Sequence, residues 1–244
     1  MIKSESTLFI SDLHLDESQP AITQQFLQLL GEIRPPVVHA LYILGDLFET
    51  WIGDDVGIPQ HRKIIDAMKA ASVRGVPIYF LCGNRDFLIG RQFLHETGCQ
   101  LLQDESRLSI HGQQILLMHG DTLCTHDLAY MKARKILRNP VLRALFLCLP
   151  AGIRKKIAAF LRKKSRQHTS MTANEIMDVT EEEVLRILKK HNASLIVHGH
   201  THRPGFHPER IVLGAWHDYP NMLVWDENGE KKLTALNSNE LSIT

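Results

Sequence analysis

Three histidines occur within five residues in "HGHTH", directly after the apolar run "SLIV" at residues 194–197. A single histidine beside an apolar run is most often a packing or surface residue. Three of them around a glycine, where a strand is expected to end, indicate metal ligation instead. This interpretation predicts that further ligands follow other apolar runs of the chain.

Side chains able to bind metal do follow four other apolar runs, in the motifs "DLH", "GD", "GNRD" and "HGD". Each motif is a weak signal alone, but five of them in order, each at an expected strand end, indicate one shared site. The seven candidate ligands are Asp12, His14, Asp46, Asn84, His119, His200 and His202.

The chemistry of this ligand set is carboxylate, imidazole and amide oxygen, without thiolate. Such a set suits Mn²⁺, Fe²⁺ or Zn²⁺ better than a closed structural zinc site. The candidates are too many for one tetrahedral ion and suit two divalent ions that share a bridging ligand. Two neighbouring ions are a common device for in-line attack on phosphorus. We expect two divalent metal ions, with Mn²⁺ the favoured one, although Fe²⁺ prefers the same ligands.

The elements that must position these ligands are strands alternating with helices. The apolar runs cover residues 7–11, 40–44, 77–82, 114–118 and 194–197. Helical periodicity is found at residues 20–33, 60–73 and 180–190, the last with a predicted cap at Thr180. This alternation predicts an α/β fold with buried sheets. Because the carboxyl ends of strands share one edge of such a sheet, the five motifs should converge there.

The later segments differ from this pattern. "RIVLGAW" and "NMLVWDENGEKKLTAL" are predicted to be antiparallel strands, the second folded as a hairpin at "ENGE". Residues 128–172 are predicted to be a helical cap inserted into a core formed by residues 1–127 and 173–244. This segment contains twelve lysines and arginines and no acidic residue, and it includes the apolar stretch "VLRALFLCLPAGI". Basic and apolar residues together are typical of contact with an anionic membrane surface or an amphiphilic ligand.

The composition of the chain disfavours several classes of protein. The chain has 244 residues, 44% of them hydrophobic, and no signal peptide or transmembrane segment is expected from its sequence. Its four cysteines are scattered, which favours reduced thiols. The basic segment lacks the interleaved aromatic residues expected for single-strand nucleic-acid binding, so we expect no nucleic-acid partner. No obligate protein partner is evident either.

Several other polar residues are assigned structural roles. His198 is expected to support its strand end, and Asp86 and Asp121 are expected to orient ligands. Trp51 either lines the site or packs beneath it. Histidines without a motif around them are expected to be surface or structural residues: His39, His61, His95, His111, His191 and His207.

The ordered motifs DxH, GD, GN(H/R)(D/E), H and GHxH resemble those of the calcineurin-like metallophosphoesterase superfamily. The resemblance implies a four-layer sandwich of two mixed β-sheets flanked by helices. It also implies that Asp46 bridges the two ions. One ion would be held by Asp12, His14, Asp46 and His202, and the other by Asp46, Asn84, His119 and His200.

Position 85 departs from the commoner superfamily pattern, which has a histidine after the asparagine. Arg85 cannot donate a proton usefully and stabilises charge instead, which favours a phosphate leaving group and hence a pyrophosphate substrate. Longer motifs, among them "LYILGDLFETWIGDD" and "CGNRDFLIG", resemble a lipid A branch of the superfamily. That branch hydrolyses UDP-2,3-diacylglucosamine to UMP and 2,3-diacylglucosamine 1-phosphate (lipid X), with water attacking the uridine-side phosphorus. The resemblance further implies a peripheral protein on the cytoplasmic face of the bacterial inner membrane.

The same resemblance implies roles for individual residues. The catalytic set would be Asn84, Arg85, Asp46 and His200. The substrate-binding set would be Asn84, Arg85, Asp127, Arg162, Ser165, Thr169, Thr172 and His200. At Thr169 and Thr172 the chain departs from the branch, which commonly has an amide and a lysine there. Two alternatives stay open: a phosphodiesterase acting on a soluble diester, and a catalytically inactive scaffold. Retention of all seven ligand types disfavours the scaffold.

Overall fold

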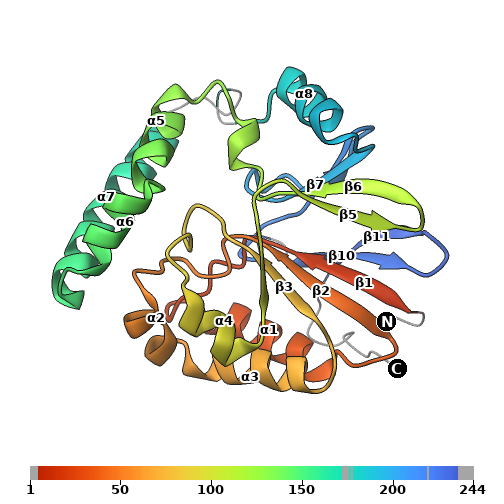
Figure 1. Ribbon diagram of the computed structural model, residues 1–244, viewed down its shortest axis with the longest axis horizontal. Coiled ribbons are helices and arrows are strands. Elements are labelled where there is room, and N and C mark those ends of the chain that lie inside the picture. Colours follow the sequence, from red (N-terminus) through yellow and green to blue (C-terminus); the bar gives the residue numbers. More distant parts are fainter. Residues whose placement is uncertain (1–4, 172–175, 177, 219, 236–244) are drawn as a thin grey trace.

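The computed structural model describes residues 5–171, 176, 178–218 and 220–235. Two β-sheets are stacked face to face, and helices cover the outer face of each, so that four layers follow one another (Figure 1). Three further helices stand beside the layers as a separate group. The predicted α/β sandwich of two mixed sheets flanked by helices is therefore confirmed.

The larger sheet carries the first three motifs. Its strands are β1 (Ser6–Ile10), β2 (Val38–Leu44), β3 (Ile78–Leu81), β4 (Gln100–Leu102), β10 (Asn221–Asp226) and β11 (Lys231–Ala235), in the order β11-β10-β1-β2-β3-β4. Strands β1 to β4 are parallel, and β10 is antiparallel to both of its neighbours. The hairpin predicted at "ENGE" is the turn between β10 and β11.

Four helices lie on the outer face of the larger sheet: α1 (Pro20–Glu32), α2 (Asp54–Gln60), α3 (Arg62–Val73) and α4 (Arg91–Thr97) (Figure 1). On β1 the side chains alternate between two hydrophobic clusters. Leu8 and Ile10 pack toward these helices, whereas Phe9 packs between the sheets, where its ring stacks 5.0 Å from that of Tyr42. The sheet is therefore buried on both faces, as its continuous apolar strands predict.

The smaller sheet carries the last two motifs. Its strands are β5 (Ser106–Ile110), β6 (Gln113–Leu117), β7 (Leu195–His198), β8 (Gly205–Phe206) and β9 (Arg210–Val212), in the order β5-β6-β7-β9-β8. Helix α8 (Glu181–His191) covers its outer face. The prediction for "RIVLGAW" was wrong in part, because β9 is short and runs parallel to β7 while pairing antiparallel only with β8.

The prediction that Thr180 caps the N-terminus of a helix was also wrong in its detail. Thr180 does precede α8, whose first turn is acidic, but its hydroxyl does not bond to the helix. It lies 2.8 Å from the hydroxyl of Thr125 and 3.2 Å from the carbonyl oxygen of Leu123. The side chain therefore joins the helix to the loop after β6, a contact that local sequence does not reveal.

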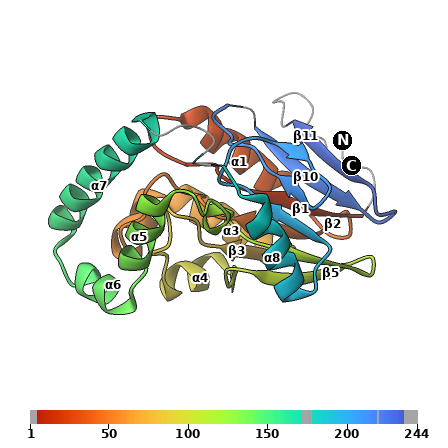
Figure 2. The ribbon, with the colours of Figure 1, turned by 90° about the horizontal axis from the view of Figure 1, so that it is seen from above.

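The separate group consists of α5 (Leu128–Leu137), α6 (Pro140–Leu147) and α7 (Ala151–Met171), here called the cap helices. Seen from above, they lie at one end of the molecule (Figure 2). The carboxylate of Asp127 caps α5 by accepting from the backbone N–H of Tyr130 at 2.9 Å. No described side chain of α5 or α6 is fully buried.

One buried arginine attaches the long helix α7 to the core. Arg154 is 3% exposed and donates to the carbonyl oxygen of Ile52 at 2.5 Å and to Asp55 at 2.9 Å. Its Nε also donates to the carbonyl oxygen of Leu149. These bonds satisfy the buried guanidinium and hold the first turn of α7 beside α2.

Among the described residues, no helix is long and apolar enough to cross a bilayer.

Candidate metal centre and adjoining cavity

The predicted ligands converge from two sheets rather than from one sheet edge. Asp12 and His14 follow β1, Asp46 follows β2, and Asn84 follows β3, all in the larger sheet. His119 follows β6, and His200 and His202 follow β7, in the smaller sheet. The prediction that they share one edge of a single sheet was wrong. The five strands are divided between two stacked sheets, and the loops that follow them meet at the same end.

Five of these ligands have a strained backbone. Positive φ angles are found at Asp12 (54°), His14 (50°), Asp46 (52°), His200 (67°) and His202 (56°). The left-handed region is uncommon for residues other than glycine, and such strain costs about 1–3 kcal/mol per residue. The surrounding fold therefore imposes a conformation that turns these side chains inward at the strand ends.

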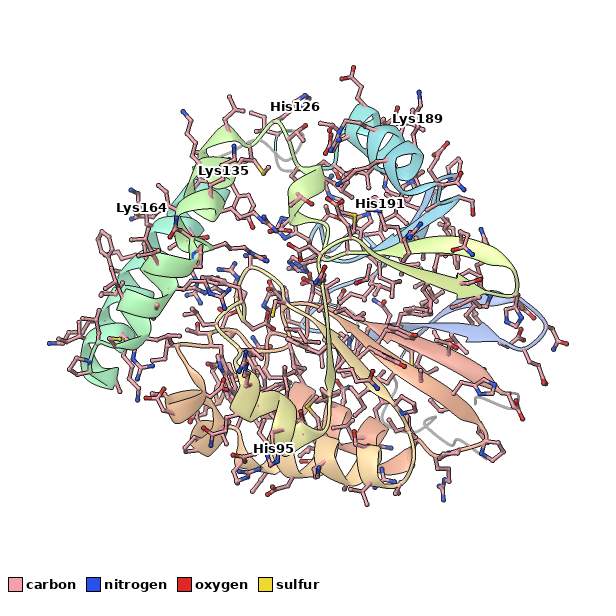
Figure 3. The ribbon with its side chains drawn as sticks, viewed as in Figure 1. His95, His126, Lys135, Lys164, Lys189 and His191 are labelled. Carbon is pink, nitrogen blue, oxygen red and sulfur yellow. The ribbon has the colours of Figure 1, made fainter. Side chains whose placement is uncertain are left out.

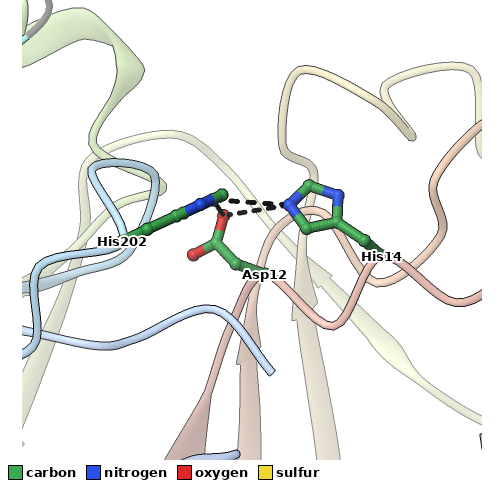
Figure 4. Close-up of side chains that lie close together, drawn as sticks. All are labelled: Asp12, His14 and His202. Carbon is green, nitrogen blue, oxygen red and sulfur yellow. Dashed lines mark hydrogen bonds and ion pairs between the residues drawn. The ribbon is translucent and has the colours of Figure 1, made fainter. Parts of the chain in front are cut away.

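Asp12, His14 and His202 form the first compact group (Figure 4). The Nε2 atoms of the two histidines are 3.4 Å apart, and Oδ1 of Asp12 lies 3.3 Å from Nε2 of His202. The other oxygen, Oδ2, accepts from the hydroxyl of Ser11 and from the backbone N–H of His200. Oδ1 is buried and has no hydrogen bond from any described residue. A buried, unpaired carboxylate oxygen facing two imidazole nitrogens fits a cation.

Asp46, Asn84 and His119 form the second group. Nδ1 of His119 lies 3.0 Å from the carbonyl oxygen of Leu44, so that nitrogen must carry the hydrogen. Nε2 of the ring then faces Oδ1 of Asn84 at 2.9 Å and Oδ1 of Asp46 at 3.8 Å. If the ring of His119 is neutral, the lone pair of its Nε2 atom faces two oxygens that are also hydrogen-bond acceptors. The arrangement therefore also fits a cation held by these three side chains.

Asp46 lies between the groups. Its Oδ2 atom is 3.9 Å from Nε2 of His14 in the first group, while Oδ1 faces His119 in the second. The backbone N–H of Arg85 donates to Oδ1 at 2.8 Å and fixes the carboxylate. This position suits the bridging role that the superfamily resemblance implies.

His200 lies beside the second group, with its ring centroid 5.0 Å from that of His119. Burial lowers the pKa of His200 to about 4, so its ring is neutral and able to act as a ligand near neutral pH. Burial also lowers the pKa of His198 to about 4. Nδ1 of His198 lies 2.8 Å from the carbonyl oxygen of Gly199, and the residue belongs to neither group.

The carboxylates make the centre attractive to positive charge. Burial opposes ionisation of Asp12, but His202, His119 and His14 outweigh it and lower the pKa of the carboxyl group. Burial likewise opposes protonation of His14 and His119, yet nearby carboxylates raise the pKa of both rings. A divalent cation can take the place of those protons, so metal binding should release them.

Two buried aspartates hold the ligand loops. Asp86 accepts from the backbone N–H groups of Leu47 (2.7 Å) and Gly83 (2.8 Å), which joins the loops after β2 and β3. Burial and the charge of Asp46 raise the pKa of Asp86 to about 7. Asp121 accepts from the hydroxyl of Tyr130 at 2.5 Å and from Nε of Arg134 at 2.7 Å. The aspartates were expected to orient ligands, and these hydrogen bonds run to backbone groups and cap side chains rather than to ligand rings.

A cavity of about 570 Å³ lies between the metal ligands and the cap helices. Four of the predicted substrate contacts line it: Asn84 and Arg85 from the core, and Arg162 and Ser165 from α7. Its wall is largely apolar and includes Phe87, Leu88, Ile136, Leu137, Leu142, Phe146, Ile157 and Leu161. Trp51 both lines the cavity and packs in the core at 2% exposure, so both interpretations of that residue hold.

Two further predicted substrate contacts, Asp127 and His200, are not among the residues that line this cavity. Asp127 caps α5, and its oxygens lie 3.0 and 3.1 Å from Nε2 of His168. Thr172 lies outside the described residues, as does the side chain of Thr169. Phe160, a candidate for an apolar groove, is 66% exposed on the outer side of the cap and does not line the cavity.

Three residues of the site were missed by the sequence analysis. The ring of His217 lies 5.5 Å from that of His202 and 6.0 Å from that of His14. Glu49 contacts His14 and the cap, and Tyr130 connects α5 to Asp121. His217 ends the motif "VLGAWH" and Glu49 follows "GDLF" by sequence, so proximity to known motifs was the available signal.

Histidines without a motif lie away from the centre. His95, on α4, and His191, at the end of α8, are on opposite sides of the molecule (Figure 3). Nε2 of His191 lies 2.6 Å from Oε2 of Glu105. His61 is buried against Phe48 and Trp51.

Comparisons with known proteins agree with this geometry. The sequence model of the family described as Calcineurin-like phosphoesterase matches residues 6–204. The chain is 46% identical to the UDP-2,3-diacylglucosamine hydrolase of Edwardsiella ictaluri, covering 92% of this chain and 90% of the relative. It is 49% identical to the protein of that name from Escherichia coli K12, covering 89% and 94%. A dimetal phosphatase from Danio rerio shares the fold, with a TM-score of 0.50 and 13% identity over 96% of this chain and all of that one.

Proposed function

Because this chain belongs to the calcineurin-like phosphoesterase family, we propose that it hydrolyses the pyrophosphate bond of UDP-2,3-diacylglucosamine. The products are UMP and 2,3-diacylglucosamine 1-phosphate (lipid X), an intermediate of lipid A biosynthesis. The observation that carries this proposal is the cavity that extends from Asn84 and Arg85, beside the ligand groups, to an apolar wall. Such a cavity suits a substrate with a phosphate group at one end and acyl chains at the other.

Two divalent ions, with Mn²⁺ favoured, fit the ligand groups and would supply positive charge and an activated water. Asp12, His14, Asp46 and His202 would hold one ion, and Asp46, Asn84, His119 and His200 the other. Water attacks the uridine-side phosphorus, and the lipid phosphate leaves. Phosphate is a good leaving group, so no protein side chain has to protonate it.

Arg85 and Arg162 supply the charge that a pyrophosphate requires. Nε of Arg85 is buried and donates no hydrogen bond to a described residue, and it lies 3.8 Å from Oδ2 of Asp46. Nε and Nη1 of Arg162 are likewise buried without a described hydrogen-bond partner. Both guanidinium groups line the cavity and can donate to phosphate oxygens. Asn84 would contact the same oxygens.

The remaining polar groups would bind the sugar and its phosphate. Ser165 lines the cavity one turn of α7 beyond Leu161. Asp127 pairs with His168, which itself lines the cavity, and could bind a sugar hydroxyl by exchanging that partner. We assign Thr169 and Thr172 to this side of the cap on the resemblance alone. Residues 128–172 then form the cap, inserted in a core of residues 1–127 and 173–244.

The outer surface of the cap fits an anionic membrane. Large apolar side chains there are exposed beside the basic residues of the segment; they include Leu128, Val141, Leu145, Ile153 and Phe160. Lys135 and Lys164 of the cap helices are both exposed, and Lys164 also lines the cavity (Figure 3). Cations near an anionic surface contribute about 1 kcal/mol each. The protein would therefore be peripheral on an anionic membrane, which the resemblance identifies as the cytoplasmic face of the bacterial inner membrane.

The decisive experiment is incubation of the purified chain with UDP-2,3-diacylglucosamine and Mn²⁺, followed by chromatographic detection of UMP. We expect UMP and lipid X in equal amounts, and no product when EDTA is present. The alternative is a phosphodiesterase for soluble diesters. Turnover of bis(p-nitrophenyl) phosphate or cyclic nucleotides, without any UMP from the lipid, would establish that alternative instead.

A further inference from the structure

We propose that Glu49 is a positioning residue that orients the metal ligand His14 and connects it to cap helix α7. This role rests on the proposed metal centre and deepens it, because it links ligand geometry to the element that lines the substrate cavity. Glu49 lies in the loop after β2, three residues beyond Asp46, and also lines the cavity. Its side chain is 19% exposed.

One carboxylate oxygen faces the ligand. Oε2 of Glu49 lies 3.3 Å from Nδ1 of His14, a nitrogen that is buried and makes no well-aligned hydrogen bond to a described residue. The other ring nitrogen, Nε2, faces the carboxylates of Asp12 and Asp46 at 3.9 Å each. A hydrogen on Nδ1 directed at Glu49 would leave the lone pair of Nε2 for a metal. Carboxylate–histidine pairs of this kind select the tautomer and raise the basicity of the ligand.

The other carboxylate oxygen faces the cap. Oε1 of Glu49 accepts from Nη2 of Arg162, and Nη2 of Arg166 lies 3.3 Å from the same oxygen. Both arginines belong to α7. Because Arg162 is 17% exposed, its pairing with Glu49 is only weakly screened by water. Glu49 thus has a distinct partner on each oxygen, a ligand ring on one and the cap on the other.

A second ion pair between α7 and the core provides a matched control. Arg154 pairs with Asp55, and this pair touches none of the seven ligands. If Glu49 only fastens the cap, then Asp55→Asn and Glu49→Ala should have the same effects. If Glu49 also positions His14, only Glu49→Ala should change metal binding.

The test measures Mn²⁺ binding by titration calorimetry and by electron paramagnetic resonance, without turnover. In Glu49→Ala we expect one of the two ions to bind roughly 10–100-fold more weakly, the effect typical of losing a ligand-orienting group. Glu49→Gln should retain most of the affinity, because its amide oxygen can still accept from Nδ1 of His14. Amide hydrogen exchange in α7 should rise in both Glu49→Ala and Asp55→Asn. The Mn²⁺ affinity of Asp55→Asn should equal that of the wild type.

The outcomes separate this role from the proposed function. Failure of the wild type to bind two Mn²⁺ ions would count against the metal centre itself. Two ions bound with wild-type affinity by folded Glu49→Ala would overturn the positioning role alone. An equally large loss in Glu49→Gln and Glu49→Ala would overturn it too, since an accepting oxygen would then be insufficient. Circular dichroism verifies the fold of each variant.

Discussion

Oδ1 of Asp46 lies 3.8 Å from Nε2 of His119, although the two residues follow strands of different sheets. The opposite oxygen of the same carboxylate faces His14 at 3.9 Å. One side chain therefore connects the ligand groups of both sheets. If it bridges two ions, replacing this carboxylate by a neutral amide should disturb both metal positions.

The first prediction concerns this bridge. Asp46→Asn should abolish turnover and leave fewer than two bound ions, because an amide provides only one oxygen. Metal analysis by mass spectrometry and the UMP assay measure the two effects. Asp66→Asn, an exposed change on α3, is the matched control. Two ions and full activity in Asp46→Asn would rule out a bridging carboxylate.

The second prediction concerns the phosphorus that water attacks. Hydrolysis in ¹⁸O-water should place one labelled oxygen in UMP and none in lipid X. The reason is that attack on the uridine-side phosphorus breaks its bond to the oxygen that leaves with the lipid phosphate. Mass spectrometry of both products gives the answer. Label in lipid X would mean that nucleophile and leaving group are reversed.

The third prediction concerns the apolar wall of the cavity. Leu142→Asp and Leu161→Asp should raise the KM for the diacylated substrate by about tenfold or more, since each CH₂ removed from water contributes about 0.8 kcal/mol. Both side chains line the cavity, whereas Leu145 is 61% exposed and does not. Leu145→Asp, assayed with substrate in detergent micelles, is therefore the control.

Hydrolysis of bis(p-nitrophenyl) phosphate should be almost unchanged in the two cavity variants, because that diester needs no acyl contacts. Equal losses on both substrates in a folded variant would show the wall to be plain structure. Phe146 is unsuitable for this test because it also packs against the main core, so its loss would affect stability.

The fourth prediction concerns the outer surface of the cap. Leu145→Ser combined with Phe160→Ser should reduce binding to vesicles that contain anionic phospholipid, measured by co-sedimentation. Leu185 on α8 is 56% exposed and lies outside the cap, so Leu185→Ser should bind as the wild type does. Binding of the wild type should also fall as salt is raised, because surface cations are screened. Equal binding by all three proteins would exclude this surface as the membrane contact.

The fifth prediction concerns the pH dependence of stability. Burial lowers the pKa of His61 to about 4, against an ordinary value of 6.5. Between those values the unfolded chain binds more protons than the folded one, so stability is lost as pH falls from 6.5 toward 4. The total cost is at most about 3 kcal/mol, from 1.36 kcal/mol per pKa unit.

His61→Gln removes this titration while keeping a neutral polar side chain. Its free energy of unfolding, measured by urea denaturation, should fall less steeply than that of the wild type between pH 6.5 and 4. His95, on α4, serves as the comparison in His95→Gln. Identical pH profiles for wild type and His61→Gln would contradict the buried neutral ring.

The sequence was sufficient for the elements whose signals are local. The helix predicted at residues 20–33 is α1, and Ile22, Phe26 and Leu29 on its apolar face are buried as their spacing requires. Strands ending in ligand motifs were equally clear, because an apolar run followed by Asp, Asn or His is unusual. Predictions were wrong where contacts with residues distant in the sequence decide the local structure. Thr180 bonds to another loop, and β9 takes its direction from β7.

The sequence by itself was sufficient to predict which side chains could hold metal and where a basic and apolar segment lies, and it places a permanently charged residue, Arg85, after Asn84. Only the tertiary structure decided that the ligands come from two sheets and that the cap encloses a cavity. It also decided that Glu49 lies between His14 and Arg162. The physical reason is distance along the chain. Glu49 and Arg162 are 113 positions apart, and neither periodicity nor propensity carries information about contacts of that separation.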